Sequence, residues 1–207
     1  MVMYYFEYYV GSKKLASAFM VSGTVTLILF TAVSRHLTQY FGKKQLYIAC
    51  MGIITLSSAL FYLLKPDQVV WMFALQIIFS AASGPTMPLL WSMYADTADY
   101  SEYRTGRRAT GLVFSAATFG QKTGAAVGSA TAMWTLALYG FVEKANLQPP
   151  MAMEGIRQLI SILPAAVAFT GFVLLFFYKI DTRLLNTVQS ALEEQRNTEN
   201  GKTIHAD

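Results

Sequence analysis

The sequence has little cysteine and little charge, and both shortages narrow the kinds of protein it can be. Because Cys50 is the only cysteine, no internal disulfide can form, and its position in an apolar run is typical of a buried side chain. No CxxC pair or His/Cys cluster suggests a metal site. Charged residues make up only 14% of the chain, against about 25% in ordinary globular domains. A water-soluble domain needs more charge to cover its surface. We therefore expect a membrane protein.

The short motifs of several enzyme classes are also missing. The sequence contains no GxSxG, Walker, GxGxxG or HExxH pattern, so nothing in it predicts a hydrolase, an ATP-driven pump or a dinucleotide-binding enzyme. The formal net charge of +4 is small and no basic stripe follows a helix face, which argues against a nucleic-acid partner. We predict that the protein is not an enzyme and has no cofactor.

What the sequence does contain is long runs without Asp, Glu, Lys or Arg. A helix of about 20 residues crosses a ~30 Å hydrocarbon core. Five such runs predict transmembrane helices at residues 15–34, 45–64, 68–95, 109–142 (broken by one charge) and 158–178. In the third run, Pro85 and Pro88 each remove a backbone hydrogen-bond donor, which predicts a kink.

The two ends of the chain differ from these runs. Residues 1–10 are apolar and aromatic, but as a helix they would rise only about 15 Å, half a membrane. We interpret them as the end of a sixth helix that has lost its beginning. Residues 1–183 would then form the transmembrane bundle of an all-α membrane protein. The polar, charged residues 184–207 predict a cytoplasmic tail with a short helix that frays into disorder.

Lysine and arginine in short loops predict the orientation of the bundle in the membrane. Alternating spans place three basic groups on one side: Arg35, Lys43 and Lys44, then Arg104, Arg107 and Arg108, then Lys179 and Arg183. The positive-inside rule makes that side the cytoplasm, so we predict a multi-pass protein of the cell's inner membrane with a cytoplasmic C-terminus. The basic turn at residues 40–44 either contacts helix ends in a partner half or only holds this orientation.

Lys122 is the position that most strongly suggests a function. It lies 14 residues after Arg108 and 21 before Glu143, too far along a helix for its side chain to reach either membrane surface easily. A lysine at this depth costs roughly 2.5–3.5 kcal/mol to insert, so it usually faces a bundle interior or a wet cavity. The alternative is a structural lysine, paired with a buried carboxylate or with helix carbonyls.

Two stripes of residues follow the helix that carries Lys122. The polar stripe consists of Ser115, Thr118, Lys122 and Ser129, and the small-residue stripe of Gly120, Gly124 and Gly128. Small residues at this spacing let another helix approach closely. We interpret Lys122, Thr118 and Ser115 as candidates for substrate binding or cation coupling. For the two hydroxyls, local bonding to backbone carbonyls is an equally good interpretation.

A charged segment separates the third and fourth runs. Its acids share a helix face and its cations follow at once, and the candidates are Asp96, Asp99, Tyr100, Glu102, Arg104, Arg107 and Arg108. Three carboxylates could bind a hard metal ion, but the cations can neutralise them, and we predict no metal. We interpret the segment as a cytoplasmic charge network that forms in one transport state and breaks in another. A solvated loop that only sets topology is the alternative.

The segment is also similar to a family signature. The run ADTADYSE at residues 95–102, TGRR at 105–108, GLVFS at 111–115 and KTG at 122–124 resemble the glycoside–pentoside–hexuronide cation symporters of the major facilitator superfamily, which include the melibiose, glucuronide and xyloside permeases. The resemblance runs from residue 4 to residue 183. It implies a transporter of two six-helix halves that rock about a substrate near the midplane, of which this chain is the second half.

The resemblance also implies roles for residues and partners. Lys122 matches a family lysine that lines the sugar and cation region, Thr118 faces the same cavity, and residues 96–108 match a loop tied to gating. The implied partners are a sugar or glycoside, H⁺ or Na⁺ as the coupling ion, the lipid bilayer and the absent amino-terminal half, which carries the family's cation-binding aspartates. Met87 and Ala117 depart from the melibiose permease and favour the xyloside and glucuronide branch. Two other hypotheses stay open: a truncated membrane protein that does not transport, and a carrier of lipid-like substrates.

Overall fold

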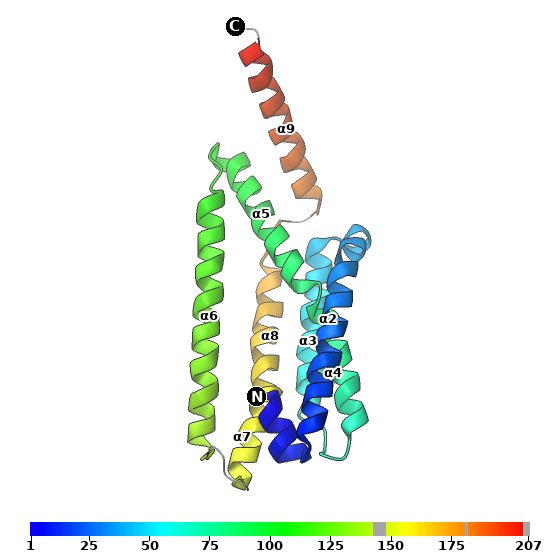
Figure 1. Ribbon diagram of the computed structural model, residues 1–207. Helices are drawn as coiled ribbons and strands as arrows, with labels where there is room; N and C mark the ends of the chain where they lie inside the picture. Colours follow the sequence, from blue (N-terminus) through cyan, green and yellow to red (C-terminus); the bar gives the residue numbers. More distant parts are fainter. Residues whose placement is uncertain (143–147, 181, 205–207) are drawn as a thin grey trace.

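The computed structural model describes residues 1–142, 148–180 and 182–204, which form helices and short connections (Figure 1). In chain order the elements are α1 (Val2–Tyr4), the π-helix η1 (Tyr5–Val10), α2 (Lys13–Phe41), α3 (Lys43–Phe61), α4 (Val69–Ser83), α5 (Thr86–Thr105), α6 (Thr110–Leu138), α7 (Pro150–Ile160), α8 (Ile162–Phe176) and α9 (Thr182–Ile204). No strand occurs in these ranges, which confirms the predicted all-α class.

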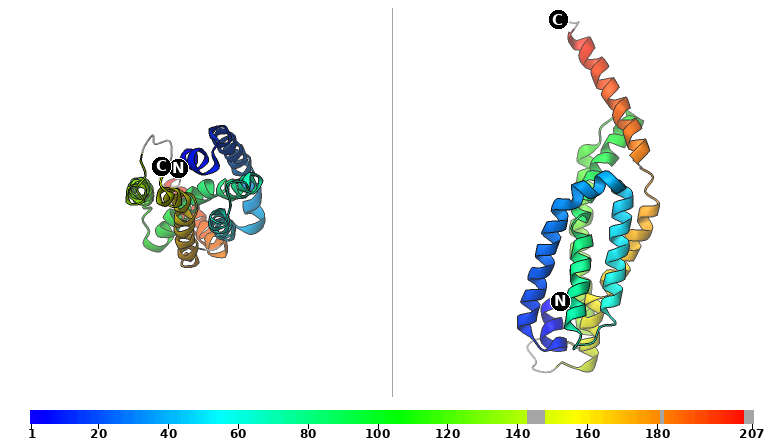
Figure 2. Two further views of the ribbon diagram at one scale, coloured as in Figure 1. Left: turned by 90° about the horizontal axis from the view of Figure 1, so that it is seen from below. Right: turned by 90° about the vertical axis from the view of Figure 1, so that its right-hand side faces the viewer.

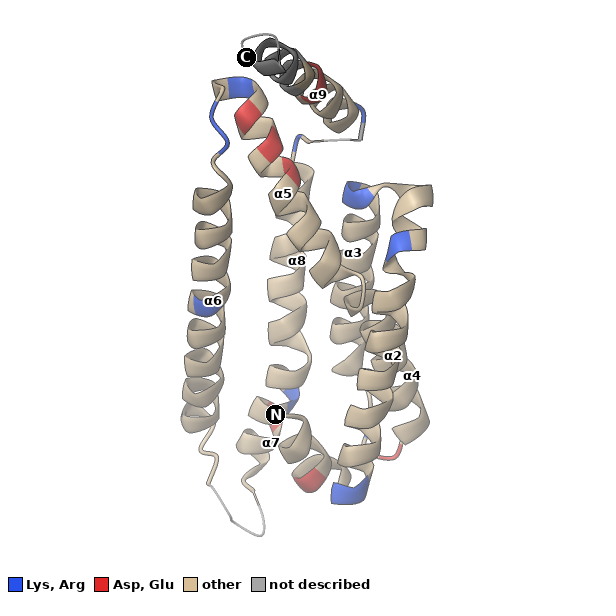
Figure 3. Cartoon of the chain, turned by 45° about the horizontal axis from the view of Figure 1, so that its top comes forward, with Lys and Arg blue, Asp and Glu red and all other residues tan. Residues whose placement is uncertain are grey.

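The long helices run alternately up and down (Figures 1 and 2). We call the end at which α9 lies the tail end, and the end at which η1 and α7 lie the far end. The α2–α3 and α5–α6 connections both lie at the tail end, so the basic groups of those turns gather there, as the alternation of spans predicts (Figures 1 and 3). Helices α2, α3, α4 and α8 pack together, whereas α6 stands at the edge and contacts α5 and α7 (Figure 1).

Four helical stretches of the described chain are long and apolar enough to cross a membrane: Lys13–Phe41, Lys43–Phe61, Val69–Thr105 and Pro150–Phe176. They cover four of the five spans that the sequence predicts. The remaining span corresponds to α6, which has 29 residues and is therefore long enough, but Gln121, Lys122 and many small residues make it less apolar. Whether α6 crosses the membrane stays a prediction.

The third predicted span is broken between α4 and α5, at Gly84 and Pro85. Pro88 has no N–H, so the Gly84 carbonyl lacks the donor that a helix would supply four residues later. The Thr31 hydroxyl of α2 lies 2.9 Å from that carbonyl and 2.7 Å from the carbonyl of Leu27 in its own helix. Because a hydroxyl has one proton, Thr31 can donate to either. The predicted kink is present, and α2 helps to satisfy its backbone.

Aromatic side chains bury the far end of the bundle. Phe6 and Tyr5 of η1 are almost fully buried, with Phe6 4.8 Å from Phe19 of α2 and Tyr5 5.4 Å from Phe61 of α3, measured between ring centroids. This packing fixes η1 although the element has only six residues. Cys50 of α3 is buried at a separate small apolar contact with Leu89 of α5 and is a free thiol.

The tail helix α9 extends further than the short helix that the sequence predicts, over 23 residues. Leu185, Val188 and Leu192 are buried on it, at three- and four-residue spacing that places them on one face. Helix α9 packs against α5, so this apolar face supports the helix well beyond the bundle. The last predicted tail residues, 205–207, lie outside the described residues.

We predict that Gly84→Ala destabilises the fold. A β-carbon at Gly84 would lie 2.8 Å from the Leu27 carbonyl oxygen and 2.8 Å from the Thr31 amide nitrogen. These are backbone atoms, which cannot move aside cheaply, so the free energy of unfolding should fall by about 1–3 kcal/mol. Thermal unfolding of the purified chain in detergent measures this change.

Gly124→Ala is the matched control for that experiment. A β-carbon at Gly124 meets nothing within 4 Å among the described residues, and alanine favours a helix interior over glycine. The control should therefore unfold at or slightly above the wild-type temperature. Equal losses in the two variants would contradict the close approach of α2 to Gly84.

Candidate functional site

Helix α6 carries the polar stripe, and the middle of this helix is open. Every residue from 119 to 130 is exposed, including Lys122. A β-carbon at Gly120, Gly124 or Gly128 would meet nothing within 4 Å in the described chain. Neither stripe therefore packs on another described element, and Lys122 is not held in the interior of this bundle. Both faces are available to something outside the described residues.

The two hydroxyl candidates bond to their own helix. Ser115 donates to the Leu112 carbonyl at 3.0 Å, and Thr118 donates to the Phe114 carbonyl at 2.8 Å. This is the local bonding that the sequence left as an alternative. Each hydroxyl oxygen still has lone pairs with which it can accept a hydrogen bond from a ligand. Ser115 is exposed and Thr118 half-buried.

At the tail end, Asp96 of α5 forms an ion pair with Lys43 at the start of α3. Both carboxylate oxygens lie 2.7 Å from the Lys43 ammonium nitrogen, and the Asp96 side chain is only 8% exposed. Removing one partner from so buried a pair leaves an uncompensated charge. The basic turn at residues 40–44 therefore contacts an acid of its own half. From the sequence we predict only a contact with a partner half or a role in orientation, because nothing local to residues 40–44 indicates a partner on α5.

The other two acids of the charged segment bind Arg108. Its guanidinium lies 3.0 Å from Asp99 and 3.6 Å from Glu102, and half of the arginine side chain is exposed. Exposed pairs of this kind contribute little to stability and exchange partners easily. Three further candidates belong to the same segment: Tyr100 is half-buried, and Arg104 and Arg107 are exposed. The predicted charge network thus divides into a buried part at Asp96 and an exposed part at Arg108.

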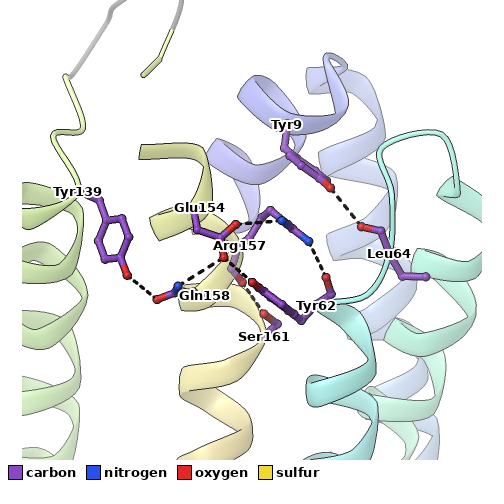
Figure 4. Close-up of polar contacts among 8 residues, drawn as sticks. All are labelled: Tyr9, Tyr62, Leu64, Tyr139, Glu154, Arg157, Gln158 and Ser161. Atoms are coloured by element: carbon purple, nitrogen blue, oxygen red, sulfur yellow. Dashed lines mark hydrogen bonds and ion pairs between the residues drawn. The ribbon is translucent and has the colours of Figure 1, made fainter. Parts of the chain in front are cut away.

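A third polar group lies at the far end and was not singled out as a site from the sequence (Figure 4). The Arg157 guanidinium of α7 lies 5.3 Å from the ring centre of Tyr9 and 4.6 Å from that of Tyr62. It forms a 2.9 Å ion pair with Glu154 and donates to the Tyr62 carbonyl at 2.7 Å. One guanidinium therefore joins η1, the end of α3 and α7.

Hydrogen bonds extend this far-end group to α6. The Tyr62 hydroxyl donates to Glu154 at 2.6 Å. The Gln158 amide also donates to Glu154, at 3.4 Å, and the Tyr139 hydroxyl donates to Gln158 at 2.9 Å. The three-residue spacing of Glu154 and Arg157 was the one sequence signal for this group.

The bundle therefore has a group of ion pairs at the tail end, the Arg157 group at the far end, and the exposed polar stripe of α6 between them. Among the described residues, no group of three or more His, Cys, Asp or Glu side chains could hold a metal ion. The chemistry that the open face offers is hydrogen bonding and charge pairing by Lys122, Thr118 and Ser115.

The chain matches a known protein family and is similar to several known proteins. A family model described as MFS/sugar transport protein matches residues 1–182. Two proteins of Escherichia coli strain K12 are each 25% identical to this chain: the glucuronide carrier protein homolog, over 94% of the chain, and the inner membrane symporter YicJ, over 93%. An uncharacterized 29.9 kDa protein of Pseudescherichia vulneris is 31% identical over 92% of the chain and 70% of its own length. The chain spans only 42% of each Escherichia coli relative.

We predict that the Lys43–Asp96 pair stabilises the tail end through its burial. Lys43→Leu leaves the Asp96 carboxylate buried without a charge partner and should cost roughly 2–4 kcal/mol, whereas the double variant Lys43→Leu/Asp96→Leu should recover most of that loss. Asp99→Leu, at the more exposed pair, is the control and should cost less than about 1 kcal/mol. Thermal unfolding of the wild type and the three variants measures these changes. A double variant as unstable as Lys43→Leu would refute the charge argument.

We predict that Arg157 fixes η1 to the bundle. Arg157→Ala removes a cation between two rings, the donor to the Tyr62 carbonyl and the ion partner of Glu154, at a cost of about 1–3 kcal/mol. Limited proteolysis near Tyr9 should become faster at the same time, because η1 loses its clamp. Arg104→Ala, at an exposed arginine of α5, should change neither. Unaltered proteolysis of Arg157→Ala would show that the buried aromatic core alone fixes η1.

Proposed function

The chain belongs to the MFS/sugar transport protein family, and on this premise we propose that it forms the carboxy-terminal half of a secondary active transporter that moves a sugar or glycoside together with H⁺ or Na⁺ by alternating access. The observation that carries this proposal is the exposure of the middle of α6 with Lys122 at its centre.

An exposed Lys122 side chain is incompatible with a helix that lipid surrounds on all sides. A charged side chain at mid-membrane depth is costly unless it faces water or a partner. The relatives from Escherichia coli are more than twice as long as this chain, which supports a second, amino-terminal bundle of six helices. We propose that this bundle faces α6 across a wet cleft near the midplane, where substrates of such transporters bind. The small-residue stripe would contact the same bundle.

The residues on α6 favour a polar, hydroxyl-rich substrate. Lys122 offers three donors, and the oxygens of Ser115 and Thr118 accept hydrogen bonds. A charge-assisted bond from the ammonium group to a carboxylate would be stronger than one to a neutral hydroxyl. One relative is named as a homolog of a glucuronide carrier, and a uronate is a sugar with such a carboxylate. We therefore propose hexuronides and related glycosides as the first substrates to test.

The ion pairs at the tail end suggest how the cleft closes. The buried Lys43–Asp96 pair joins α3 to α5 and would keep this half rigid in every state. The exposed contacts of Arg108 with Asp99 and Glu102 lie at the junction of α5 and α6, where rearrangement costs little. We propose that Arg108 exchanges partners between this half and the other half during transport. By the positive-inside rule this end faces the cytoplasm.

A truncated product that does not transport is the competing hypothesis, because the chain alone supplies one wall of a cleft. A carrier of lipid-like substrates is disfavoured, since the acyl chain of such a substrate would lie against the polar stripe that contains Lys122, Thr118 and Ser115. Both hypotheses predict no uptake of sugars by the chain together with an amino-terminal half.

We predict that Lys122→Ala lowers sugar uptake. Cells that express the full-length gene should accumulate one of three radiolabelled classes (glycosides, pentosides or hexuronides), and cells that express this chain alone should not. Loss of the ammonium group should reduce uptake by about 10- to 100-fold, the equivalent of one charge-assisted hydrogen bond. Lys65→Ala, at an exposed residue of the α3–α4 loop, is the control. Uptake by Lys122→Ala at the wild-type level with unchanged ion dependence would remove Lys122 from the site.

A further inference from the structure

The turn between α2 and α3 forms a basic recess that the transport proposal does not use. One cavity of about 320 Å³ is lined by Thr38, Gln39, Lys44 and Gln45 together with the turn itself. A second, of about 430 Å³, adjoins it through Thr38 and Gln39 and includes Arg35. None of the described residues that line either cavity is acidic. The recess is therefore electropositive.

Two of the three cations at this turn remain available to a ligand. Lys43 is neutralised by Asp96. Lys44 donates to the carbonyl of Tyr178, which uses one of its three protons and none of its charge. Arg35 is exposed on the last turns of α2. An anion in the recess could thus contact the Arg35 guanidinium and the remaining donors of Lys44.

The position of the turn in the membrane favours a lipid headgroup as the source of the anion. A single residue, Gly42, separates α2 from α3, and both helices are among the stretches apolar enough to cross a membrane. The turn must then lie at the depth of the lipid headgroups. Tyr40 and Phe41, 84% and 57% exposed, flank the recess, and aromatic side chains are favoured at this depth. Basic pockets at the ends of membrane helices bind anionic headgroups.

We propose that this recess binds the phosphate of an anionic phospholipid, with Arg35 and Lys44 pairing with the phosphate and Tyr40 and Phe41 lying against the glycerol and upper acyl chains. The charge complementarity excludes a preference for zwitterionic phosphatidylcholine. The two lysines at the positively polarised start of α3 also repel the helix dipole, and a bound phosphate offsets that repulsion. The proposal requires only that the chain is embedded in a membrane and does not depend on transport.

Native mass spectrometry of the purified chain tests the proposal with phosphatidylglycerol and phosphatidylcholine added at equal concentration. The wild-type chain should retain phosphatidylglycerol selectively. Arg35→Gln/Lys44→Gln should bind it roughly 25-fold more weakly, since each cation near an anionic lipid contributes a factor of about five. Lys13→Gln/Lys14→Gln removes the same charge at the opposite end of α2 and should bind phosphatidylglycerol like the wild type.

Three results would overturn the proposal. The first is equal loss in the two double variants, which would indicate non-specific attraction. The second is wild-type affinity in Arg35→Gln/Lys44→Gln. The third is complete displacement of phosphatidylglycerol by excess inorganic phosphate, which would assign the recess to a free anion. If circular dichroism shows that this double variant does not fold, the single variants Arg35→Gln and Lys44→Gln carry the test, each with an expected loss of about fivefold.

Discussion

The cost of an unpaired charge in hydrocarbon governs how this chain is built. Its helices keep nearly all their ionisable residues near the two ends, where water, lipid headgroups or ion partners are at hand. Ion pairing neutralises the half-buried charges there: Asp96 pairs with Lys43, and Glu154 pairs with Arg157. Lys122 is the exception, because it lies within an exposed run of α6 that extends from residue 119 to residue 130. This face of α6 is the one that we propose meets another polar surface.

The backbone follows the same constraint as the side chains. A proline-rich break in a membrane helix frees carbonyl groups that lipid cannot solvate. Here the break between α4 and α5 lies against α2. The Thr31 hydroxyl approaches the Gly84 carbonyl, and the α2 backbone at Leu27 and Thr31 leaves no room for a side chain at Gly84. The close contact of α2 with α4 is therefore a condition for the break, and the break directs α5 across the bundle toward α6 (Figure 1).

Much of the fold could be predicted from the sequence, because helix length and apolar composition are local properties. Four spans, the kink near Pro85 and the family resemblance all come from short stretches of residues. The partners of individual charges could not be predicted in this way. Lys43 and Asp96 are 53 residues apart, and Arg157 meets Tyr62 from 95 residues away. The spacing of acids and cations in residues 96–108 suggested one network, but spacing on a single helix cannot show that Asp96 faces α3.

For the candidate site too, the features within one helix could be predicted from the sequence, whereas contacts with distant residues could not. The stripe of Ser115, Thr118 and Lys122 is a property of one helix, because spacing along a helix determines which residues share a face. What that face contacts is a property of distant elements, which spacing along one helix does not encode.

The burial of Cys50 makes this chain convenient for such experiments. Its sole native thiol is 5% exposed and packs against Leu46 and Leu89, so water-soluble maleimides should react with it slowly. A cysteine introduced along α6 would then be the preferred target without any prior removal of the native one. Reaction rates along that helix, in the presence and absence of the amino-terminal bundle, would map which positions are wetted and which are sealed.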